Sequence, residues 1–544
     1  MKKIKSVVFW AGIFTLILAT ILVKPLDNLD EMWNFNIARC ISNGLVPYKD
    51  ISMITTPFLG FITAVFFKIF GTEMFVTRIL AAILAMINII LIYRIFRNLK
   101  INNVIAKTST LVIGLSLLEF FCLDYNFFTI TLVLAIILLE IKLQKKHSIY
   151  KHLTIGLLAG LSICTKQSIG LLICLVVVLN RFFFIKNKSD LKKCFKEILF
   201  RAIGIIIPLS VFVIYLLATN SFSFFIDYNI LGIKTFSNKI AYKSLFSSNL
   251  FSVKFLAAVV PAFIFVAIVE NIYFKVKKNE KKSLYTLTVY SIPTFAIMYP
   301  IANNIHFLIA SIVPIILIIY GLYKVIRMTP KFKSDNKIYK YLLEFLEIVI
   351  TLFIALYLAY FQIENMDRLS NLSKYTKLNN FKYIYVDTGM KKRIDEVDNY
   401  ILSQEKNVYI LDSSSAIYMI PINKYNKNYD MFKKGNLGSG GEDLQIEKIK
   451  NEDAKYLVLK DEYNLNWQAP TKVISYVKQN LKYTGSIGNF DVYENFEEKQ
   501  NSNNSDETVS SEENNDNENA EQTVEDIVQT EEVIEQTEEI SEQN

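Results

Sequence analysis

The chain has 544 residues, of which 52% are hydrophobic and 20% charged, and its formal net charge at pH 7 is +8. Soluble globular domains are less apolar, and the apolar residues here form runs of about 20, the length that spans a bilayer. The basic residues lie mostly between these runs, where membrane topology accounts for them, so the charge does not indicate nucleic-acid binding. No cysteine lies beyond Cys194, which excludes disulfides from the C-terminal half.

The first apolar run, residues 6–23, follows three lysines, which predicts an N-terminus on the cytoplasmic side. No small-residue cleavage site follows the run, so we interpret it as a retained span rather than a signal peptide. The next apolar run, residues 57–70, is short, and we expect an interfacial helix there. Counting it as a span would place the basic cluster that ends the run 74–96 on the outside.

The later apolar runs also predict spans, and basic clusters recur at each inner turn. Together they give about eleven transmembrane helices, with the C-terminus outside, and therefore a polytopic all-α membrane protein. In one of these runs Gly156 and Gly160 are four residues apart, a spacing that permits close helix packing. The later predicted spans are residues 104–122, 127–143, 152–166, 168–185, 198–218, 251–274, 284–301, 305–324 and 341–362.

The chain changes character after a transmembrane domain that we place at residues 1–365. In residues 366–496, amphipathic helical patterns alternate with short strand-like runs, which predicts a small extracellular α/β domain. From residue 497 to 544 the chain is rich in Glu, Asn, Ser and Gln and nearly lacks aromatic residues, so we expect a disordered acidic tail. The predicted helices are residues 390–405 and 470–481, and the predicted strands are residues 407–412, 455–460 and 489–495.

Acidic residues near the outer ends of the spans are the first candidates for chemistry. The stretch after the first span carries Asp27, Asp30 and Glu31. An acid at this place caps the helix that follows and complements its dipole. Capping explains one acid well and two less well, so capping and function both stay open. Asp124 lies in a short outer turn, where a cap is the common use, although the turn keeps its carboxylate near the membrane surface.

Basic residues near the same face are the second candidates. Lys166 separates two short spans, so its charge should lie at or below the outer interface, where a charge usually faces a cavity or a partner. Snorkelling to lipid headgroups is the alternative. His306 begins a span, and a lone histidine there is more often a structural hydrogen-bonding group. The outer loop 219–250 carries cations that suit an anionic ligand, either as a lid or as a plain surface loop.

The sequence shows no motif for a required cofactor. The glycine-rich run that begins at Gly435 lacks the Lys-Ser/Thr of a phosphate loop, so we expect a flexible turn before a helix. The chain has three histidines, too few for a His-rich metal site. Dependence on a divalent metal stays open.

The stretch from Asp30 onward resembles the first outer loop of GT-C superfamily membrane glycosyltransferases, in the bacterial branch related to protein mannosyltransferases and the lipid A aminoarabinose transferase. That loop has Asp-Glu, an alanine two turns on, Gly-x-x-Pro-Tyr-x-Asp, a proline, an interfacial helix that ends in Phe-Gly, and an arginine. The resemblance covers about residues 1–365. The residues that match this loop are Asp30, Glu31, Ala38, Gly44, Pro47, Tyr48, Asp50, Pro57, Phe70, Gly71 and Arg78; later matches are Asp124, Gly156 to Lys166, His306 and Pro314.

The resemblance implies a bacterial cell-membrane enzyme that moves a sugar from a polyprenyl-phosphate donor to a hydroxyl of a glycan, lipid or protein. It implies a GT-C fold and, for a single displacement, inversion at the anomeric carbon. Asp27 falls outside the matching register and is predicted to be a cap. By the resemblance the catalytic residues are Asp30, the expected base, with Glu31 and Asp124; Lys166 and His306 bind the donor phosphate; and Tyr48, Asp50 and Arg78 belong to the substrate loop.

The chain departs from this pattern in one important place. Many relatives carry a lysine before the prolines that follow the first loop, and that lysine is thought to meet the lipid phosphate, but Thr55 and Thr56 stand here. Three other functions stay open: a lipid-linked saccharide flippase or transporter, a surface polysaccharide polymerase or ligase, and a surface-binding protein. The acids lie in outer loops rather than at the bilayer midplane, which favours an enzyme over a transporter.

Overall fold

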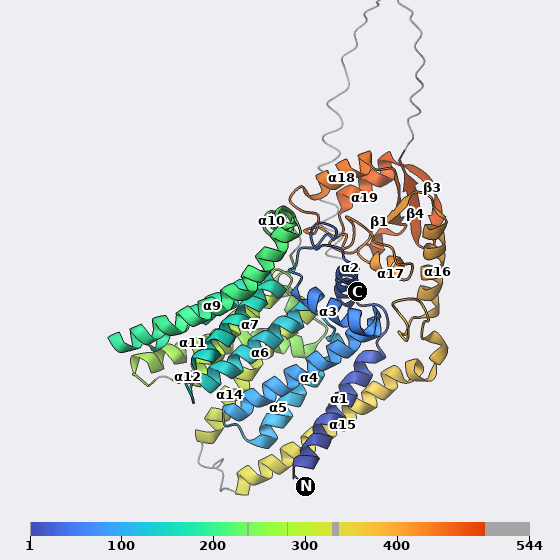
Figure 1. Ribbon diagram of the computed structural model, residues 1–544. Coiled ribbons are helices and arrows are strands. Elements are labelled where there is room, and N and C mark those ends of the chain that lie inside the picture. Colours follow the sequence, from blue (N-terminus) through green and yellow to red (C-terminus); the bar gives the residue numbers. More distant parts are fainter. Residues whose placement is uncertain (1, 237–238, 280, 329–336, 496–544) are drawn as a thin grey trace, which may run out of the picture. The chain divides into compact units, whose positions relative to one another are not determined.

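The apolar runs of the sequence fold into long helices that pack along their sides (Figure 1). The computed structural model describes residues 2–236, 239–279, 281–328 and 337–495. The predicted acidic tail lies outside these residues. Buried aliphatic side chains from many of the helices form one apolar core. The helices of this bundle are α1 (Lys2–Leu22), α4 (Met74–Asn98), α5 (Asn103–Ser116), α6 (Tyr125–Leu143), α7 (Ile149–Thr165), α8 (Gln167–Leu179), α9 (Lys188–Ala218), α11 (Phe251–Val276), α12 (Lys282–Phe295), α14 (Ile312–Met328) and α15 (Lys337–Ser370).

Helices α7 and α9 approach each other closely. Helix α7 also packs against α6 and α8, while α4 packs against α1, α5 and α6. A Cβ atom on Gly156 of α7 would lie 2.1 Å from the carbonyl oxygen of Arg201, and one on Gly160 would lie 2.6 Å from that of Ile205. The close packing predicted from this glycine pair is therefore confirmed.

The composition of the helices confirms a multi-pass membrane protein. Among the described residues, five segments are long and apolar enough to cross a membrane: α4, α6, α8 with its following turn, α9 and α11. Helix α13 (Asn304–Ala310) and α14 would add a sixth as one span bent by 48°. The larger count of about eleven spans and the orientation of the termini stay predictions.

Four of the predicted spans are shorter or broken in the structure, and one of them, residues 168–185, forms a helix only to Leu179. Helix α5 ends at Ser116, and the chain turns into a short 3-10 helix (Leu118–Phe120). The ammonium of Lys24 donates to carbonyl oxygens of this turn, including that of Leu118 at 3.0 Å, which also accepts the backbone N–H of Phe121 at 3.2 Å. Helix α12 ends at Phe295, and the run 305–324 is divided between α13 and α14. Composition does not reveal these breaks because apolar residues continue through them.

The predicted first outer loop folds into two packed helices, α2 (Leu29–Ser42) and α3 (Phe58–Phe70). The side-chain oxygen of Asn28 accepts a hydrogen bond of 2.9 Å from the backbone N–H of Glu31, which caps α2. The prediction that Asp27 is the cap is therefore wrong. Helix α3 confirms a helix in the short apolar run, whereas its interfacial position stays a prediction.

The C-terminal part of the described chain contains a mixed four-stranded sheet in the order β1-β2-β4-β3. Strand β1 (Asn407–Ile410) is parallel to β2 (Ala454–Leu459), and β4 (Phe490–Glu494) is antiparallel to both β2 and β3 (Lys482–Ile487). The three predicted strands are confirmed, whereas β3 was not predicted because its edge position leaves most of its side chains exposed. The accompanying helices are α16 (Thr388–Ser403), α17 (Ala416–Met419), α18 (Gly441–Asn451) and α19 (Thr471–Asn480).

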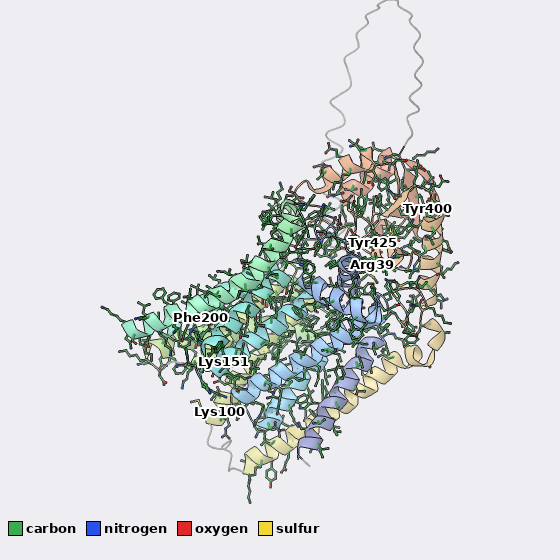
Figure 2. All side chains as sticks on the ribbon, viewed as in Figure 1. Arg39, Lys100, Lys151, Phe200, Tyr400 and Tyr425 are labelled. Carbon is green, nitrogen blue, oxygen red and sulfur yellow. The ribbon has the colours of Figure 1, made fainter. Side chains whose placement is uncertain are left out.

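The sheet-bearing region is called the outer domain below, after its predicted position, and it packs against the predicted first outer loop. Phe35 of α2 and Phe67 of α3 share an apolar core with Phe381 and with residues of α16 and the sheet. The fully buried Arg39 of α2 donates a 2.7 Å hydrogen bond to the carbonyl of Lys424 and lies 4.5 Å from the ring centroid of Tyr425 (Figure 2). The shared core therefore fixes α2 against the outer domain.

Candidate functional site

Titratable side chains from five separate parts of the chain lie within electrostatic range of one another near the first turn of α2. Asp30 comes from α2, Asp124 precedes α6, and Lys166 lies in the break between α7 and α8. The charges of Lys433 and Lys166 both act on Asp30, and the charge of Asp30 acts on Asp124. His306 of α13 lies within electrostatic range of both lysines. We call these five residues the outer cluster. Four of them were predicted site residues, and Lys433 was not.

Asp30 carries the carboxylate of the outer cluster that is free to react. It is partly exposed, and its carboxylate makes no hydrogen bond or ion pair with any residue that the structure describes. Burial raises the pKa of Asp30 above the usual carboxyl value, while the positive charges of Lys433 and Lys166 oppose this rise. A carboxylate with free lone pairs and a raised pKa suits a general base.

Asp124, Asn126 and Lys166 form a hydrogen-bonded chain beside Asp30. Asp124 caps α6 by accepting the backbone N–H of Phe127 at 2.8 Å, and its other oxygen accepts the side-chain N–H of Asn126 at 3.0 Å. The carbonyl oxygen of Asn126 in turn accepts the ammonium of Lys166 at 2.6 Å. Burial, followed by the charge of Asp30, raises the pKa of Asp124 to about 7. Asp124 therefore orients Asn126, which orients Lys166.

His306 is held in one orientation by Asn303. The side-chain oxygen of Asn303 accepts both the backbone N–H of His306, at 2.9 Å, and its ring Nδ1, at 2.8 Å. Nδ1 therefore carries a proton, and Nε2 of the neutral ring is a hydrogen-bond acceptor. Only a protonated His306 can donate Nε2–H to a phosphate.

Glu31 and Arg78 form a buried ion pair outside the outer cluster. The Nε and Nη2 of Arg78 each donate a 3.0 Å hydrogen bond to one oxygen of Glu31. Arg78 also donates to the backbone carbonyls of Leu22, Lys24 and Pro25. Arg78 is fully buried and Glu31 is 5% exposed. The pair therefore ties the end of α1 to α2 and α4.

Tyr48 and Asp50 shape the first outer loop. The hydroxyl of Tyr48 donates to the carbonyl oxygen of Thr55 at 2.9 Å, and the carboxylate of Asp50 accepts the backbone N–H of Val46 at 2.8 Å. Tyr48 is buried, and it holds a positive φ of 70° in the turn. Both side chains are engaged by the loop itself, and the structure does not bring them into the outer cluster.

Lys433 enters the outer cluster from the outer domain. Its ammonium lies 4.1 Å from the ring centroid of Trp33 in α2, and the indole N–H of Trp33 donates to the carbonyl oxygen of Ser413 at 2.8 Å. No sequence signal distinguishes Lys433 from the many other lysines of the chain, because its partner is about four hundred residues away.

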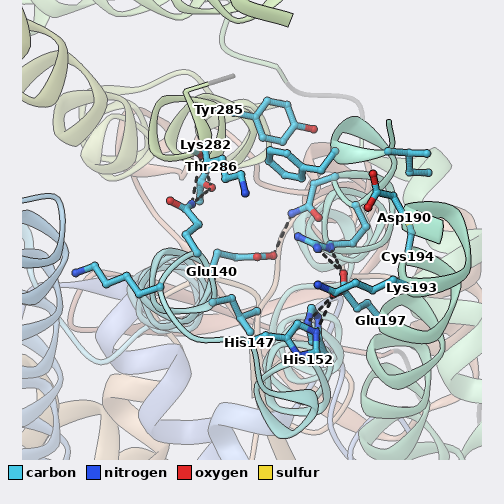
Figure 3. Close-up of a pocket in the computed structure, with 17 residues that line it drawn as sticks. Glu140, His147, His152, Asp190, Lys193, Cys194, Glu197, Lys282, Tyr285 and Thr286 are labelled. Carbon is cyan, nitrogen blue, oxygen red and sulfur yellow. Dashed lines mark hydrogen bonds and ion pairs between the residues drawn. The ribbon is translucent and has the colours of Figure 1, made fainter. Parts of the chain in front are cut away.

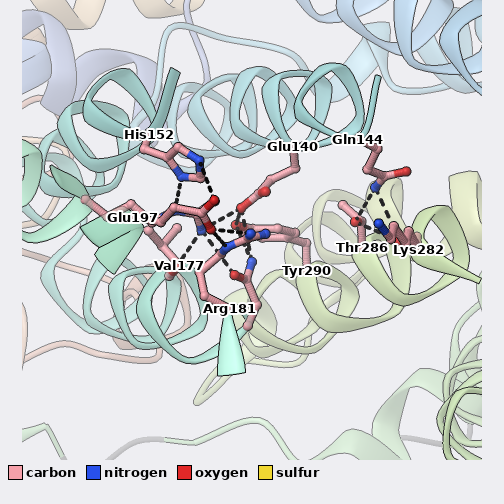
Figure 4. A network of polar contacts seen from close by, with 11 residues as sticks. Glu140, Gln144, His152, Val177, Arg181, Glu197, Lys282, Thr286 and Tyr290 are labelled. Atoms are coloured by element: carbon pink, nitrogen blue, oxygen red, sulfur yellow. Dashed lines mark hydrogen bonds and ion pairs between the residues drawn. The ribbon is translucent and has the colours of Figure 1, made fainter. Parts of the chain in front are cut away.

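A second polar site lies at the opposite ends of the bundle helices. A cavity of about 350 Å³ is lined by residues at the ends of α6, α7, α8, α9 and α12. Figure 3 shows the side chains that line it. Buried ion pairs hold the carboxylates of its wall: Arg201, behind the lining residues, contacts Glu140 at 2.7 Å, and Arg181 contacts Glu197 (Figure 4). Asn180 also donates to Glu140, at 3.1 Å. These pairs neutralise the buried charges of both carboxylates.

His147, His152 and Glu197 in this wall have potential metal-ligand atoms within 4.8 Å of one another. However, Nδ1 of His152 accepts a 3.1 Å hydrogen bond from Nε of Arg201. Its Nε2 therefore carries the proton of the neutral ring and cannot bind a metal without forming an imidazolate. The carboxylate of Glu197 already accepts a hydrogen bond of 2.8 Å from Nε of Arg181. The donor chemistry suits an ion-paired network better than a divalent cation.

Comparisons with known proteins relate the chain to one fold. Residues 55–218 match the family model described as dolichyl-phosphate-mannose-protein mannosyltransferase. The crystal structure of ArnT from Cupriavidus metallidurans in the apo state is similar, with a TM-score of 0.57 and 12% identity. The structure of ArnT bound to undecaprenyl phosphate has a TM-score of 0.54 and 11% identity. Each covers 91% of this chain and 98% of its own. No curated protein sequence matches the chain.

Proposed function

We propose that this chain is a GT-C membrane glycosyltransferase, which its family match and its shared fold support. It transfers a sugar from a polyprenyl-phosphate donor to a hydroxyl acceptor at the outer face of the membrane. The observation that carries the proposal is the outer cluster. A carboxylate without a protein partner, Asp30, lies beside two ammonium groups that have no carboxylate in contact among the described residues. The fold that holds this cluster is shared with a protein crystallised with undecaprenyl phosphate.

The proposed reaction is a single displacement at the anomeric carbon of the donor sugar. The acceptor oxygen forms the new bond while the bond to the lipid phosphate breaks, so the configuration inverts. Asp30 accepts the proton of the acceptor hydroxyl as that bond forms. The leaving phosphate gains negative charge, which the ammonium of Lys166 stabilises.

The remaining predicted site residues receive different roles in this proposal. Asp124 positions Lys166 through Asn126, and it does not itself contact the sugar. His306 presents Nε2 as an acceptor, which suits a sugar or acceptor hydroxyl better than a phosphate. Glu31 and Arg78 hold the loop, so we assign them no part in the chemistry.

The substitution Asp30→Asn tests the proposed base. A positioned general base contributes about 10²–10⁴-fold to a rate, so transfer should fall at least about a hundredfold. The melting temperature should stay unchanged, since the Asp30 carboxylate makes no hydrogen bond with the described residues. Asp27→Asn is the matched control, because Asp27 is exposed and precedes the same helix. Transfer by Asp30→Asn at the rate of the control would remove Asp30 from the mechanism.

A further inference from the structure

Lys433 is a buried ammonium without a direct anionic partner. The residue is 9% exposed, and its ammonium makes no hydrogen bond or ion pair with any residue in the described ranges. Its contact is with the face of the Trp33 ring, 4.1 Å away. A cation–π contact offsets only part of the cost of removing an ammonium from water. A buried charge of this kind is expected where an anion binds.

The surroundings of Lys433 agree with that expectation. Burial lowers the pKa of Lys433 below the usual lysine value, and the negative charge of Asp30 opposes only part of this fall. The same charge cluster includes Lys166, whose ammonium is bound to the neutral amide of Asn126 rather than to a carboxylate. Both lysines therefore lie within electrostatic range of Asp30, and no carboxylate of the described residues contacts either ammonium directly. The phosphodiester of a lipid-linked sugar carries one negative charge, which becomes two as the sugar leaves, and its oxygens accept hydrogen bonds from ammonium groups.

The segment that carries Lys433 is held in place from both sides. Asn436 donates to the carbonyl oxygen of Ser52 in the first outer loop at 3.2 Å. The carboxylate of Asp227, after α10 (Phe222–Ile226), accepts the backbone N–H of Ser439 at 3.1 Å. Gly438 has a positive φ of 72°, and a Cβ there would lie 2.4 Å from an oxygen of Asp227. These contacts fix the position of Lys433 over α2.

We propose that Lys433 of the outer domain binds the phosphate of the lipid-linked donor together with Lys166. The inference rests on the proposed function and deepens it. Thr55 and Thr56, where the resemblance would place a lysine, do not supply this charge. The hydroxyl of Thr56 donates to the carbonyl oxygen of Ile163 at 2.8 Å, and the residue is 5% exposed. The outer domain is thus part of the donor site and not only an attachment to it.

The test compares Lys433→Met with Lys434→Met in the full chain, reconstituted in lipid nanodiscs. Lys434 is the adjacent lysine, less buried and outside the outer cluster, so it is the matched control. The probe is undecaprenyl phosphate, measured by direct binding and by the shift that it causes in the melting temperature. Lys433→Met should weaken binding at least tenfold, Lys434→Met less than twofold, and Lys433→Arg should restore most of the affinity.

The melting temperature without ligand gives a second, independent readout. Removing an unpaired buried charge should leave the free protein as stable as the wild type, or more stable. Lys433→Met should therefore melt at the same or a higher temperature, yet lose the stabilisation that undecaprenyl phosphate gives to the wild type. A variant that melts lower or fails to fold shows that Lys433 serves the structure, and this outcome overturns the proposal.

The outcomes separate this inference from the proposed function. If the wild type binds undecaprenyl phosphate and Lys433→Met binds it equally well, the role of Lys433 is wrong and the proposed function stands. If the wild type itself does not bind the lipid, the proposed function fails as well. Loss of binding in Lys433→Met but not in Asp30→Asn is the pattern that supports both.

Discussion

The neighbouring acids Asp30 and Glu31 should respond to substitution in opposite ways, and Glu31→Gln measures the difference. Glu31 and Arg78 are buried and share two hydrogen bonds of 3.0 Å. Glutamine keeps one acceptor oxygen but turns an NH₂ group toward the guanidinium, so Arg78 stays buried with its charge uncompensated. Breaking a buried pair in this way costs about 3–5 kcal/mol.

The expected consequence of Glu31→Gln is a fall in melting temperature of roughly 5–10 °C, since about 2 °C corresponds to 1 kcal/mol in a large chain. Differential scanning fluorimetry of the detergent-solubilised chain measures it. The double variant Glu31→Gln with Arg78→Met should melt higher than Glu31→Gln alone, because it removes the uncompensated charge. A Glu31→Gln protein that melts as the wild type does but has lost transfer would refute the structural role of this pair.

Two further predictions concern Lys166 and the glycines of the bundle. Burial lowers the pKa of Lys166 to about 8, although the charges of Asp124 and Asp30 oppose this fall. The value of kcat/KM should therefore decrease as pH rises past about 8, where the ammonium loses its proton. Lys166→Arg should move this alkaline limit of activity upward by at least about one pH unit. An alkaline limit that does not move in Lys166→Arg contradicts a phosphate-binding ammonium. Gly156→Leu should prevent the packing of α7 on α9 and abolish the yield of folded protein, since even a Cβ would lie 2.1 Å from a backbone carbonyl. Gly12→Leu, where a Cβ meets nothing within 4 Å, should give a normal yield; equal yields of the two variants would contradict the close contact.

Most of the outer cluster was predictable because the predicted topology brings alternate ends of the spans to the same side. The positions of Asp30, Asp124, Lys166 and His306 at those ends follow from the alternation of apolar runs and basic turns. The side chains that complete the geometry were not predictable. Asn126, for example, connects Asp124 to Lys166, but asparagine after a capping acid has no distinctive pattern.

The sequence does not reveal that the neighbouring carboxylates of Asp30 and Glu31 have different surroundings. Successive residues of a helix point about 100° apart, so one acid of α2 faces the lysines while the next faces Arg78, 47 residues later in the chain. The cap of α2 was assigned to Asp27 by register, whereas Asn28 fills it, because both residue types cap well. The path of the chain after α1 decides whether Asp27 or Asn28 caps α2.

The outer domain shows where local patterns fail to predict contacts over a long distance. The alternating strands and amphipathic helices α16 and α19 predicted an α/β region with good boundaries. Nothing local predicted that Lys433 would be buried against Trp33, because that contact depends on the packing of the whole domain on α2. Lone charges buried by a distant element are the feature that sequence patterns describe least well.

The central claim is tested most directly by sugar transfer in a reconstituted system. The donor is the lipid-linked sugar that accumulates in a strain lacking the protein, and the measurement is release of free polyprenyl phosphate by wild type, Asp27→Asn and Asp30→Asn. The account predicts release by the wild type and by Asp27→Asn, and at least about a hundredfold slower release by Asp30→Asn, which still binds undecaprenyl phosphate. Release by Asp30→Asn at the wild-type rate, or movement of the intact donor across the bilayer without cleavage of the sugar–phosphate bond, would contradict it.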